Sequence, residues 1–540
     1  MANEAPRPAP RPAPQPARGN PFEKYRRPLP VLPEFDRFDE EMTADVVIIG
    51  GGHGGTQCAL AAAEGGASVI VVEAKQEDRF TYVGEQVGTF NSQFLINKGF
   101  GPYDLNEIVN EICQQSGFMA NRTLINKYVK RSGEMLDHMI SLVPAGSTIL
   151  DDDQCNVHEA YGKPSYPVTV GGCKSWAGTL QFRGGIRARP LPPEPGERMR
   201  NTSRLPEFEM LAVRRSQELG AVWSFGVRAQ RLISENGRVV GAYGKRTKDG
   251  KIIRFGARRA VVLATGLPGN GVDLGRDVGG FVEPDVHVST SLILPVRCFG
   301  NSSFLLLNAR GERFCNESVP YGLSSAVMLQ PPGHLSVVTD RKYMLQMQQN
   351  GLQHGNPDFG VPEYEEQFIE DMNEVPKHGA EGFCVRDMAF TGRGAMDRMY
   401  AADTLDELAG YLGYEGEAKK TWLASIERYN ALCRAGVDDD FQKDANTLIP
   451  IDEAPFYGAV AEKPLYKDQT AHPSQPIPAL YANNDMNVVN EDFLEIPGLY
   501  AAGDCLGGRY GIYYYTPCGG NFIGTSMTLG RELGKHLASL

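Results

Sequence analysis

The sequence predicts an α/β protein built on a Rossmann-like parallel sheet, and three observations support this prediction. Residues 45–50 (DVVIIG) and 68–73 (SVIVVE) are short β-branched runs, which are typical of buried parallel strands. A glycine-rich loop and a run of small residues at 55–65, typical of a helix, lie between them. Another buried strand, AVVLAT at 260–265, follows much later in the chain.

The composition excludes several classes of protein. The 540 residues include 54 Lys and Arg against 66 Asp and Glu, which gives a formal net charge of −12. Because binding to nucleic acid needs a basic surface, we expect no nucleic-acid partner. The sequence has no apolar run of about 18 residues, so we also expect no membrane span.

The cysteines point to no metal centre. None of the ten cysteines forms a CxxC pair, so zinc, c-type haem and iron–sulfur clusters have no support, and we predict no metal site. A chain of this length needs no disulfide bond to hold its core. We therefore expect reduced cysteines and a cytoplasmic location.

Residues 1–34 differ from the rest of the chain, because Pro and Ala dominate them and apolar side chains are few. Such a segment buries too little surface to offset the entropy of ordering, so we predict a disordered, proline-rich tail over residues 1–40. No apolar stretch follows its basic residues, unlike in a secretory signal. We interpret the tail as inert, with a docking peptide as the alternative.

The remaining elements follow the first β–α–β unit in order. Helical patterning covers 104–141, and residues 145–200 are rich in Gly, Pro and Asp and look loop-heavy. The pattern then predicts a helix at 208–219, strands at 221–224, 229–234, 238–243 and 251–255, a mixed region of strands and helices from about 276 to 454, a strand at 499–502 and a helix at 521–540.

The first loop has the spacing of a dinucleotide site. Gly50, Gly52 and Gly55 form a GxGxxG pattern between strand and helix, which allows a tight turn and the close approach of a pyrophosphate to the helix N-terminus. Glu73 ends the second strand, at a spacing that suits a carboxylate accepting from ribose hydroxyls. We therefore assign these four residues to cofactor binding.

Two distant segments bear on whether the dinucleotide is NAD or FAD. One is the turn Ala264-Thr265-Gly266 after the buried strand. The other is IPGLYAAGD (496–504), which is followed by a helix that starts near Gly519-Gly520-Asn521.

At this point the sequence resembles the FAD-dependent family of fumarate reductase and succinate dehydrogenase flavoproteins, urocanate-type reductases and 3-ketosteroid dehydrogenases. The resemblance covers about 43–540. Its motifs are VVIIGGGHGG, VVLATG, NARGERFCNES (308–318), DTLDELA (403–409), DDDFQK (438–443), APFYGA (454–459), IPGLYAAGD and GGNFIGTSMTLGRELG (519–534).

The resemblance implies FAD and a Rossmann-like (GR2-type) FAD-binding domain interrupted by an α+β capping or substrate domain. We place the FAD-binding domain at 41–275 and 455–540, and the capping domain at 276–454. Within the motifs, Gly503, Asp504 and Ile523 join the cofactor residues, and Asp504 resembles the acid that holds the ribityl chain. The helix that begins at Gly519-Gly520-Asn521 would turn its positive end to the flavin, which favours the negative charge of the reduced ring.

The sequence departs from fumarate reductases where those enzymes hold substrate arginines. The catalytic Arg of that family stands four residues after the Glu of the NE motif, and here Tyr321 stands four residues after Glu317. A second Arg two residues before the glycine pair is replaced by Pro517. Ketosteroid dehydrogenases resemble this chain at both places, with a catalytic Tyr in an NE-x-x-PY context and another Tyr before the glycines, which Tyr515 resembles.

These replacements bear on the substrate. A buried dicarboxylate needs cationic partners, so fumarate or succinate is disfavoured unless one of four other arginines supplies the charge: Arg183, Arg187, Arg189 or Arg297. Tyrosine instead offers an O–H to a neutral carbonyl or phenol and an aromatic face. We infer a neutral, cyclic, conjugated small molecule.

The expected chemistry is flavin hydride transfer to one carbon and proton transfer to its neighbour. We assign the proton to Tyr321, and the polarisation of a substrate carbonyl to Tyr515. Which of Tyr513, Tyr514 and Tyr515 faces the flavin stays open. His287 aligns near a substrate-binding His of fumarate reductases, with a structural role as the alternative.

The leading hypothesis is an FAD-dependent ene reductase. The alternatives are a ketosteroid-type dehydrogenase that runs in the oxidative direction and a flavin-containing protein that binds a ligand without turnover. The sequence has no haem motif and no second GxGxxG at a strand end. The electron donor is therefore a separate reductase, free reduced flavin or NAD(P)H.

Overall fold

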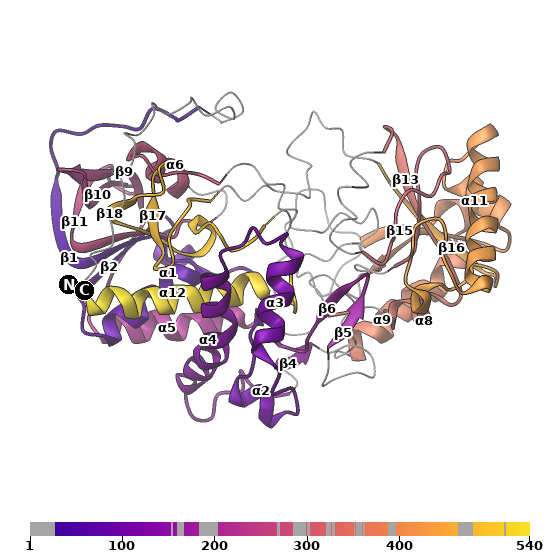
Figure 1. Ribbon diagram of the computed structural model, residues 1–540, viewed down its shortest axis with the longest axis horizontal. Coiled ribbons are helices and arrows are strands. Elements are labelled where there is room, and N and C mark those ends of the chain that lie inside the picture. The colour runs from indigo at the N-terminus through magenta and orange to yellow at the C-terminus, as the bar shows by residue number, and fades with distance from the viewer. Residues whose placement is uncertain are drawn as a thin grey trace, which may run out of the picture.

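This structure, a computed structural model, describes residues 28–152, 155–158, 167–182, 203–266, 270–283, 299, 303–319, 326, 330–349, 351–352, 359, 362–386, 396–462, 479–511 and 515–540. Several predictions lie outside this part of the chain: residues 1–27 of the tail, the catalytic candidates Tyr321 and His287, Tyr513 and Tyr514, and the four alternative arginines at 183, 187, 189 and 297. Figure 1 shows two bodies, one around a large sheet with both the first and the last helices, and one around a smaller sheet.

The larger sheet confirms the predicted α/β class. Its main path in spatial order is β17 (Asn487–Val489), β18 (Glu495–Ala501), β11 (Ile252–Leu263), β1 (Glu40–Ile49), β2 (Val69–Glu73) and β8 (Val222–Phe225). The strands from β18 to β8 are parallel, whereas β10 (Arg238–Arg246) and β9 (Val227–Glu235) add an antiparallel extension to β11. The side chains of Val46–Ile49 are almost completely buried, as expected for a parallel strand that is covered on both faces.

One strand is longer than predicted. We expected separate strands at 251–255 and 260–265, but β11 runs without interruption, because the intervening residues still pair with β1, Thr43 opposite Gly256 and Ala44 opposite Ala257. The partner strand β1 also begins earlier than expected, at Glu40. Pairing across the sheet therefore extends a strand through residues with little β character of their own.

The last residues of the segment that we assigned to the proline-rich tail contact the antiparallel extension of the larger sheet. Phe35 and Phe38 pack their rings against Tyr243, with centroids 5.5 and 5.7 Å away, and the Tyr243 hydroxyl donates to the carbonyl of Pro33 at 2.6 Å. Residues 33–40 thus lie on the sheet extension. Aromatic side chains give this stretch the apolar contact area that the Pro-Ala sequence before it lacks.

Helices cover the larger sheet, and the first helix contacts the last. In Figure 1, α12 (Asn521–Ser539) lies alongside α1 (His53–Glu64), with α5 (Leu205–Glu218) next to them. A Cβ added at Gly530 would lie 2.2 Å from the carbonyl oxygen of Gly54. The small residues of both helices therefore let two backbones approach closely, and this joins the two ends of the chain in one core.

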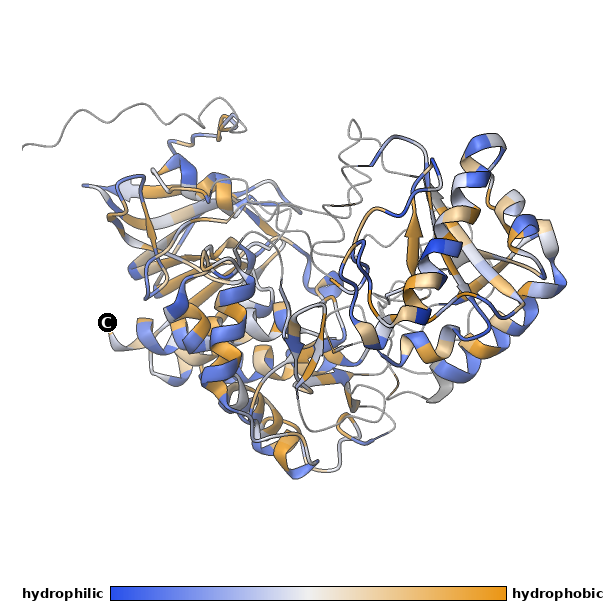
Figure 2. Cartoon of the chain, turned by 45° about the vertical axis from the view of Figure 1, so that its right-hand side comes forward, coloured by the Kyte–Doolittle hydropathy of each residue, from blue (hydrophilic) through white to orange (hydrophobic). Residues whose placement is uncertain are grey.

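The helices predicted in 104–141 and 208–219 are confirmed as α3 (Leu105–Gln115), α4 (Arg122–Ser141) and α5. Figure 2 shows orange along the sheet strands and a mixture of orange and blue on the outer helices, as expected for amphipathic helices on a buried sheet. Within the part of the chain that is described, no helix combines the length and apolar character needed to cross a bilayer.

The smaller sheet is fully antiparallel. Its order is β12 (Leu305–Leu307), β13 (His334–Asp340), β16 (Phe456–Glu462), β15 (Met396–Ala402) and β14 (Phe383–Arg386). Leu306 packs into one core with α8 (Tyr343–Met347) and α9 (Pro362–Glu374), and Leu305 and Leu307 into another with α10 (Leu405–Tyr411) and α11 (Gly416–Ala435). Since β16 belongs to this sheet, we propose that the capping domain ends after this strand and not at residue 454.

A hairpin within the stretch expected to be loop-heavy reaches toward both bodies. It consists of β5 (Val168–Val170) and β6 (Cys173–Ser175), and Figure 1 places it between them. The amide of Gly171 donates to Asp444 Oδ2 at 2.6 Å, and Ser175 Oγ accepts from the amide of Leu352 at 2.8 Å. Directly after the hairpin, the amide of Trp176 donates to the carbonyl of Pro517 at 2.7 Å. The hairpin thus connects the segment before α12 to the loop between α11 and β16 and to the segment after α8.

Candidate cofactor and active site

The glycine loop connects β1 to α1 and packs against the residue that follows β11. Gly50 has φ +101°, and a Cβ built there would lie 2.4 Å from the carbonyl oxygen of Ala264, so this position needs glycine. A Cβ at Gly55 would lie 2.1 Å from the carbonyl oxygen of Gly50. By contrast, a Cβ at Gly52 would meet no atom within 4 Å. The loop therefore packs tightly against other backbone at Gly50 and Gly55 but is open at Gly52, where a ligand can approach the backbone.

The start of α1 has the donor groups of an anion site. Gly52 is its N-cap and provides no side-chain hydrogen bond, and its first turn contains no acidic residue. No side chain therefore caps the positive end of this helix or neutralises it within its own first turn. This arrangement fits a diphosphate group.

Glu73 lies beside the loop, as predicted. Its Oε2 accepts from the amide of Gly51 at 2.8 Å and its Oε1 accepts from the amide of Lys75 at 2.8 Å. The residue is 8 % exposed. Because each carboxylate oxygen can accept a second hydrogen bond, Glu73 keeps capacity for ribose hydroxyls.

The other predicted cofactor residues gather at the same edge of the sheet. A Cβ on Gly54 would lie 2.7 Å from the amide nitrogen of Gly503, and one on Gly266 would lie 3.9 Å from Asp504 Oδ2. Thr265 Oγ1 accepts from the amide of Gly271, at 2.9 Å. Residues from the turns after β1, β11 and β18 thus meet at the carboxyl ends of parallel strands, where α/β sheets bind their ligands.

The start of α12 completes this arrangement. Gly520 has φ +68°, and its carbonyl accepts from the amide of Gly88 at 2.9 Å, which holds the helix start against β3 (Gln86–Gly88). The helix has no side-chain cap and no acid in its first turn. Asn521 is 3 % exposed, and its Oδ1 has no hydrogen-bond partner in the described part of the chain. The side chain of Ile523 packs against Gly84, because a Cβ built at Gly84 would lie 2.5 Å from Ile523 Cδ1.

These observations fit a flavin dinucleotide. Two uncapped helix starts, a buried carboxylate and an unpartnered buried amide oxygen lie around one edge of the sheet, and they match the polar groups along such a molecule. The cofactor residues that the sequence predicted all lie in this region. Gly519 is among them, and its carbonyl accepts a hydrogen bond from Thr179 Oγ1 at 2.6 Å.

Arg509 belongs to the same region, and sequence reasoning missed it. Its side chain is 1 % exposed, and its guanidinium carbon lies 5.1 Å from the ring centroids of both Tyr510 and Phe522. Its Nη2 is 3.5 Å from Asp504 Oδ1, and its Nη1 donates to Ser526 Oγ at 3.4 Å. The available signal was a lone arginine in a glycine-rich segment five residues after the predicted ribityl acid.

Glu283 is a second residue that the sequence did not single out. It lies just before the segment with His287, and the amide of Gly508 donates to its Oε1. Burial raises the pKa of the Glu283 carboxyl to about 7. A carboxyl that titrates near neutrality therefore lies next to the Arg509 loop.

Tyr515 is buried, with 2 % of its surface exposed, and its hydroxyl donates to the backbone carbonyl of Lys174 in β6. A tyrosine has one O–H proton, so Tyr515 can polarise a substrate carbonyl only when this hydrogen bond is broken. Its catalytic role stays a prediction, as do those of Tyr321 and His287.

The NARGERFCNES motif carries a buried charge network just before Tyr321. Arg313 donates from Nε and Nη2 to the two oxygens of Glu317 at 2.9 Å each, and from Nη1 and Nη2 to Asp438 at 3.1 and 2.7 Å. Lys443 Nζ lies 3.6 Å from Glu317 Oε2. Burial lowers the pKa of the Lys443 ammonium, although Glu317 acts in the opposite direction. The network fixes the chain at the point where the Tyr321 segment begins.

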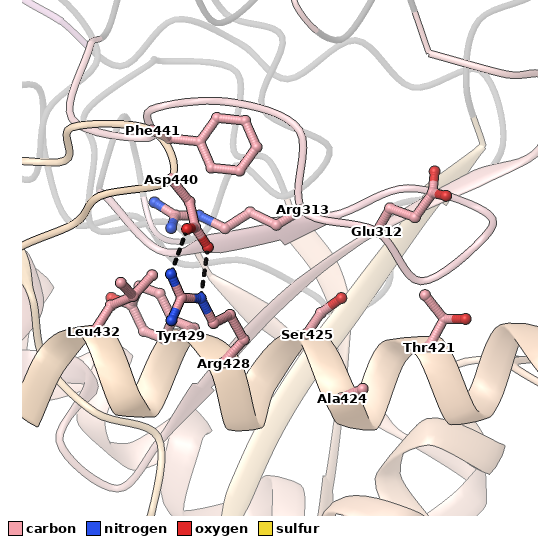
Figure 3. A pocket seen from close by; sticks show the side chains of 10 residues that line it. All are labelled: Glu312, Arg313, Thr421, Ala424, Ser425, Arg428, Tyr429, Leu432, Asp440 and Phe441. Carbon is pink, nitrogen blue, oxygen red and sulfur yellow. Dashed lines mark hydrogen bonds and ion pairs between the residues drawn. The ribbon is translucent and has the colours of Figure 1, made fainter.

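A groove of about 300 Å³ lies elsewhere, between α11 and the turn before Arg313. Arg428 and Asp440 face each other across one part of it and form two hydrogen bonds of 3.0 and 2.6 Å (Figure 3). In Figure 1, α11 lies on the outer side of the smaller sheet, far from α1 and α12. None of the residues that we predicted for the site lines this groove.

Known proteins resemble the chain over most of its length. The model of the FAD binding domain family matches residues 45–290 and 283–523. Digoxin reductase of Eggerthella lenta is 24% identical over 548 residues, which cover 93% of this chain and 88% of that protein. Vinyl phenol reductase of Lactiplantibacillus plantarum is 27% identical over 240 residues, 44% of this chain and 43% of that protein.

Among solved structures, 3-ketosteroid-Δ4-(5α)-dehydrogenase of Rhodococcus jostii shares the fold, with a TM-score of 0.59 and 20% identity over 93% of this chain and 98% of that one. The resemblance stated from the motifs is thereby confirmed, together with FAD as the cofactor. The chain belongs to the FAD binding domain family and is an FAD-dependent oxidoreductase that acts on CH–CH groups.

Proposed function

We propose that this enzyme reduces the activated C=C bond of a neutral, ring-containing small molecule. The observation that carries the proposal is the replacement of both substrate arginines of fumarate reductases, by Tyr321 and Pro517, together with the neutral Tyr515 beside the helix that faces the flavin. A diacid would lack its cationic partners there, whereas an enone or a phenol meets hydroxyl groups. The names of two relatives, digoxin reductase and vinyl phenol reductase, support a ring-containing substrate.

The cofactor residues have separate tasks in this proposal. The amides at the start of α1 bind the FAD diphosphate, Glu73 binds the ribose, Asp504 binds the ribityl chain, and the start of α12 faces the flavin ring. When bound, FAD supplies the hydride that adds to one alkene carbon. The positive end of α12 would stabilise the negative charge that the reduced ring carries before this transfer.

Tyr321 donates the proton to the neighbouring carbon. An ordinary tyrosine has a pKa of about 10 and is a competent acid at neutral pH. Tyr515 holds the hairpin through Lys174 and turns its hydroxyl to a substrate carbonyl when that bond is exchanged. The buried network of Arg313 and Glu317 holds the beginning of the Tyr321 segment in place.

The test is anaerobic reoxidation of the reduced enzyme. The flavin is reduced chemically, and its absorbance is followed after addition of a cyclic enone, a vinyl phenol or fumarate. We expect rapid reoxidation by one of the neutral conjugated compounds and none by fumarate. Reoxidation by fumarate alone contradicts the proposal, and a spectral shift without reoxidation by any compound indicates a flavoprotein that only binds its ligand.

A cyclic enone and its saturated ketone together decide the direction of the reaction. The ketosteroid dehydrogenase-like NE-x-x-PY context of Tyr321 favours oxidation as a second candidate function. In that case the oxidised enzyme should bleach when it is mixed with a saturated cyclic ketone, and the reduced enzyme should react slowly with the corresponding enone.

A further inference from the structure

His53 occupies an unusual place for a basic residue. It is the first residue of α1, directly after the N-cap Gly52, and therefore lies within the glycine loop. The N-terminus of a helix is positive, so a cation there is disfavoured unless negative groups surround it. The first turn of α1 contains no acid that could serve this purpose.

Both ring nitrogens of His53 face acceptors. Nδ1 lies 2.8 Å from Glu209 Oε1, and Nε2 lies 3.1 Å from the carbonyl oxygen of Val83. A neutral imidazole has a single N–H, so it can donate to only one of these two groups. The doubly protonated, positively charged imidazolium donates to both groups at once, with Glu209 as the carboxylate.

The negative groups come from other elements. Glu209 on α5 has a fully buried side chain, and its second oxygen, Oε2, has no hydrogen-bond partner among the described residues. Asp504, from the turn after β18, and the ring of Tyr82, 5.4 Å from the imidazole centroid, also face His53. Burial lowers the pKa of His53, but the carboxylates of Glu209 and Asp504 outweigh burial, and the pKa lies above its ordinary value.

We propose that His53 is a cofactor-binding residue whose positive charge, maintained by Glu209, attracts the FAD diphosphate to the start of α1 through space, while both of its N–H groups stay bonded to the protein. The charge has two roles at this place. It attracts the phosphates, and it neutralises Glu209, whose carboxylate otherwise repels them.

Deprotonation therefore has a predictable sign. Above the pKa of His53, an uncompensated Glu209 carboxylate faces the diphosphate, and FAD binds more weakly. Below this pKa the imidazolium is present, and FAD binds more tightly. The diphosphate of FAD is a diester and keeps its charges throughout this range, so the phosphates do not cause the pH dependence.

The test measures FAD release from the holoenzyme, through the rise of flavin fluorescence on dilution, between about pH 6 and about pH 9.5. In the wild type we expect the dissociation constant to rise with pH. His53→Gln should weaken FAD binding about tenfold at pH 6 and remove most of the pH dependence. His53→Gln combined with Glu209→Gln should bind FAD more tightly than His53→Gln alone, because the uncompensated carboxylate is gone.

A second pair provides the control. His138 Nε2 lies 2.8 Å from Glu64 Oε1, at the other end of α1. His138→Gln removes a pair of the same kind and should leave FAD release and its pH dependence unchanged. The thermal unfolding midpoint of each variant is measured in parallel.

Three results overturn the proposal. One is FAD release from His53→Gln within about twofold of the wild type at every pH. Another is FAD binding by His53→Gln that is weaker than in the wild type by the same factor at every pH, which indicates that the shape of the His53 side chain matters and not its charge. The third is a lowered unfolding midpoint of His53→Gln with an unchanged dissociation constant, which makes the pair purely structural.

Discussion

The hydroxyl of Tyr515 donates a hydrogen bond to the backbone carbonyl of Lys174, and this contact fastens the segment before α12 to the β5–β6 hairpin. The same hairpin contacts the loop between α11 and β16, through the amide of Gly171 and Asp444 Oδ2 at 2.6 Å. A residue that we predicted for catalysis thus also holds the hairpin that links the segment before α12 to this loop.

This relationship predicts two separable effects of Tyr515→Phe. The variant should lose about 1 kcal/mol of unfolding free energy, because the Lys174 carbonyl loses its donor. If Tyr515 also polarises the substrate, turnover should fall by a larger factor than stability explains. Denaturant unfolding and steady-state turnover measure the two effects.

Tyr103→Phe is the matched control, since the Tyr103 hydroxyl donates to the carbonyl of Ala177 at 3.0 Å. We expect a comparable loss of stability and normal turnover. Equal turnover in both variants would leave Tyr515 with its structural contact alone.

Tyr321→Phe should retain bound flavin and lose about 10²-fold or more in turnover, the scale of general acid catalysis. Phenylalanine keeps the ring and removes the proton donor. Absorbance at the flavin bands checks the cofactor, and anaerobic stopped-flow reoxidation checks the chemical step. Tyr411→Phe, which removes an exposed hydroxyl that donates to Glu407 at 2.5 Å, should behave as the wild type. Normal reoxidation in Tyr321→Phe would remove this residue from the mechanism.

Alanine at two glycines of the loop should have opposite consequences. Gly52→Ala should fold normally, because its Cβ meets no atom within 4 Å, but should bind FAD at least about tenfold more weakly, because the methyl group fills the space above the loop. Gly50→Ala should destabilise the protein itself, since its Cβ would lie 2.4 Å from the Ala264 carbonyl oxygen. FAD titration and thermal unfolding without FAD distinguish the two. Unchanged FAD affinity in Gly52→Ala would place the diphosphate elsewhere.

Glu283 predicts a pH dependence of stability. Burial raises its pKa from 4.5 to about 7, so the folded state holds this proton more tightly than the unfolded state. The contribution of this group to the stability of the folded protein is fully present below the pKa that Glu283 has in the unfolded chain. It is lost as the pH rises through about 7.

Glu283→Gln cannot ionise, so its free energy of unfolding does not carry this loss. Relative to the wild type, the free energy of unfolding of Glu283→Gln should therefore rise by about 1–3 kcal/mol from about pH 5 to about pH 8. Urea unfolding at both pH values measures the difference. Glu218→Gln, on an exposed side chain that pairs with Arg215, is the control. An equal pH profile in wild type and Glu283→Gln would mean that this carboxyl titrates normally.

The residues that we assign to the cofactor could be identified in the sequence because they follow one another within short, local patterns. Gly50, Gly52 and Gly55 stand within one turn, and Glu73 follows at the end of the next strand, so the order of a single β–α–β unit is enough to bring them together. The later motifs around Gly503 and Gly520 are as recognisable, because glycines at fixed positions mark where backbones must approach closely.

Contacts between distant segments were decided by the tertiary structure. Glu209 lies 156 residues after His53, and Lys174 lies 341 residues before Tyr515, so no spacing rule relates the members of either pair. The burial of Arg509 beside two rings and the continuous length of β11 likewise depend on what packs or pairs with them. By itself, therefore, the sequence determined the fold class, the cofactor and the backbone turns that we assign to it. The folded chain decided which charges are buried together, because a charge is stabilised by the partners that topology brings to it and not by its neighbours in the sequence.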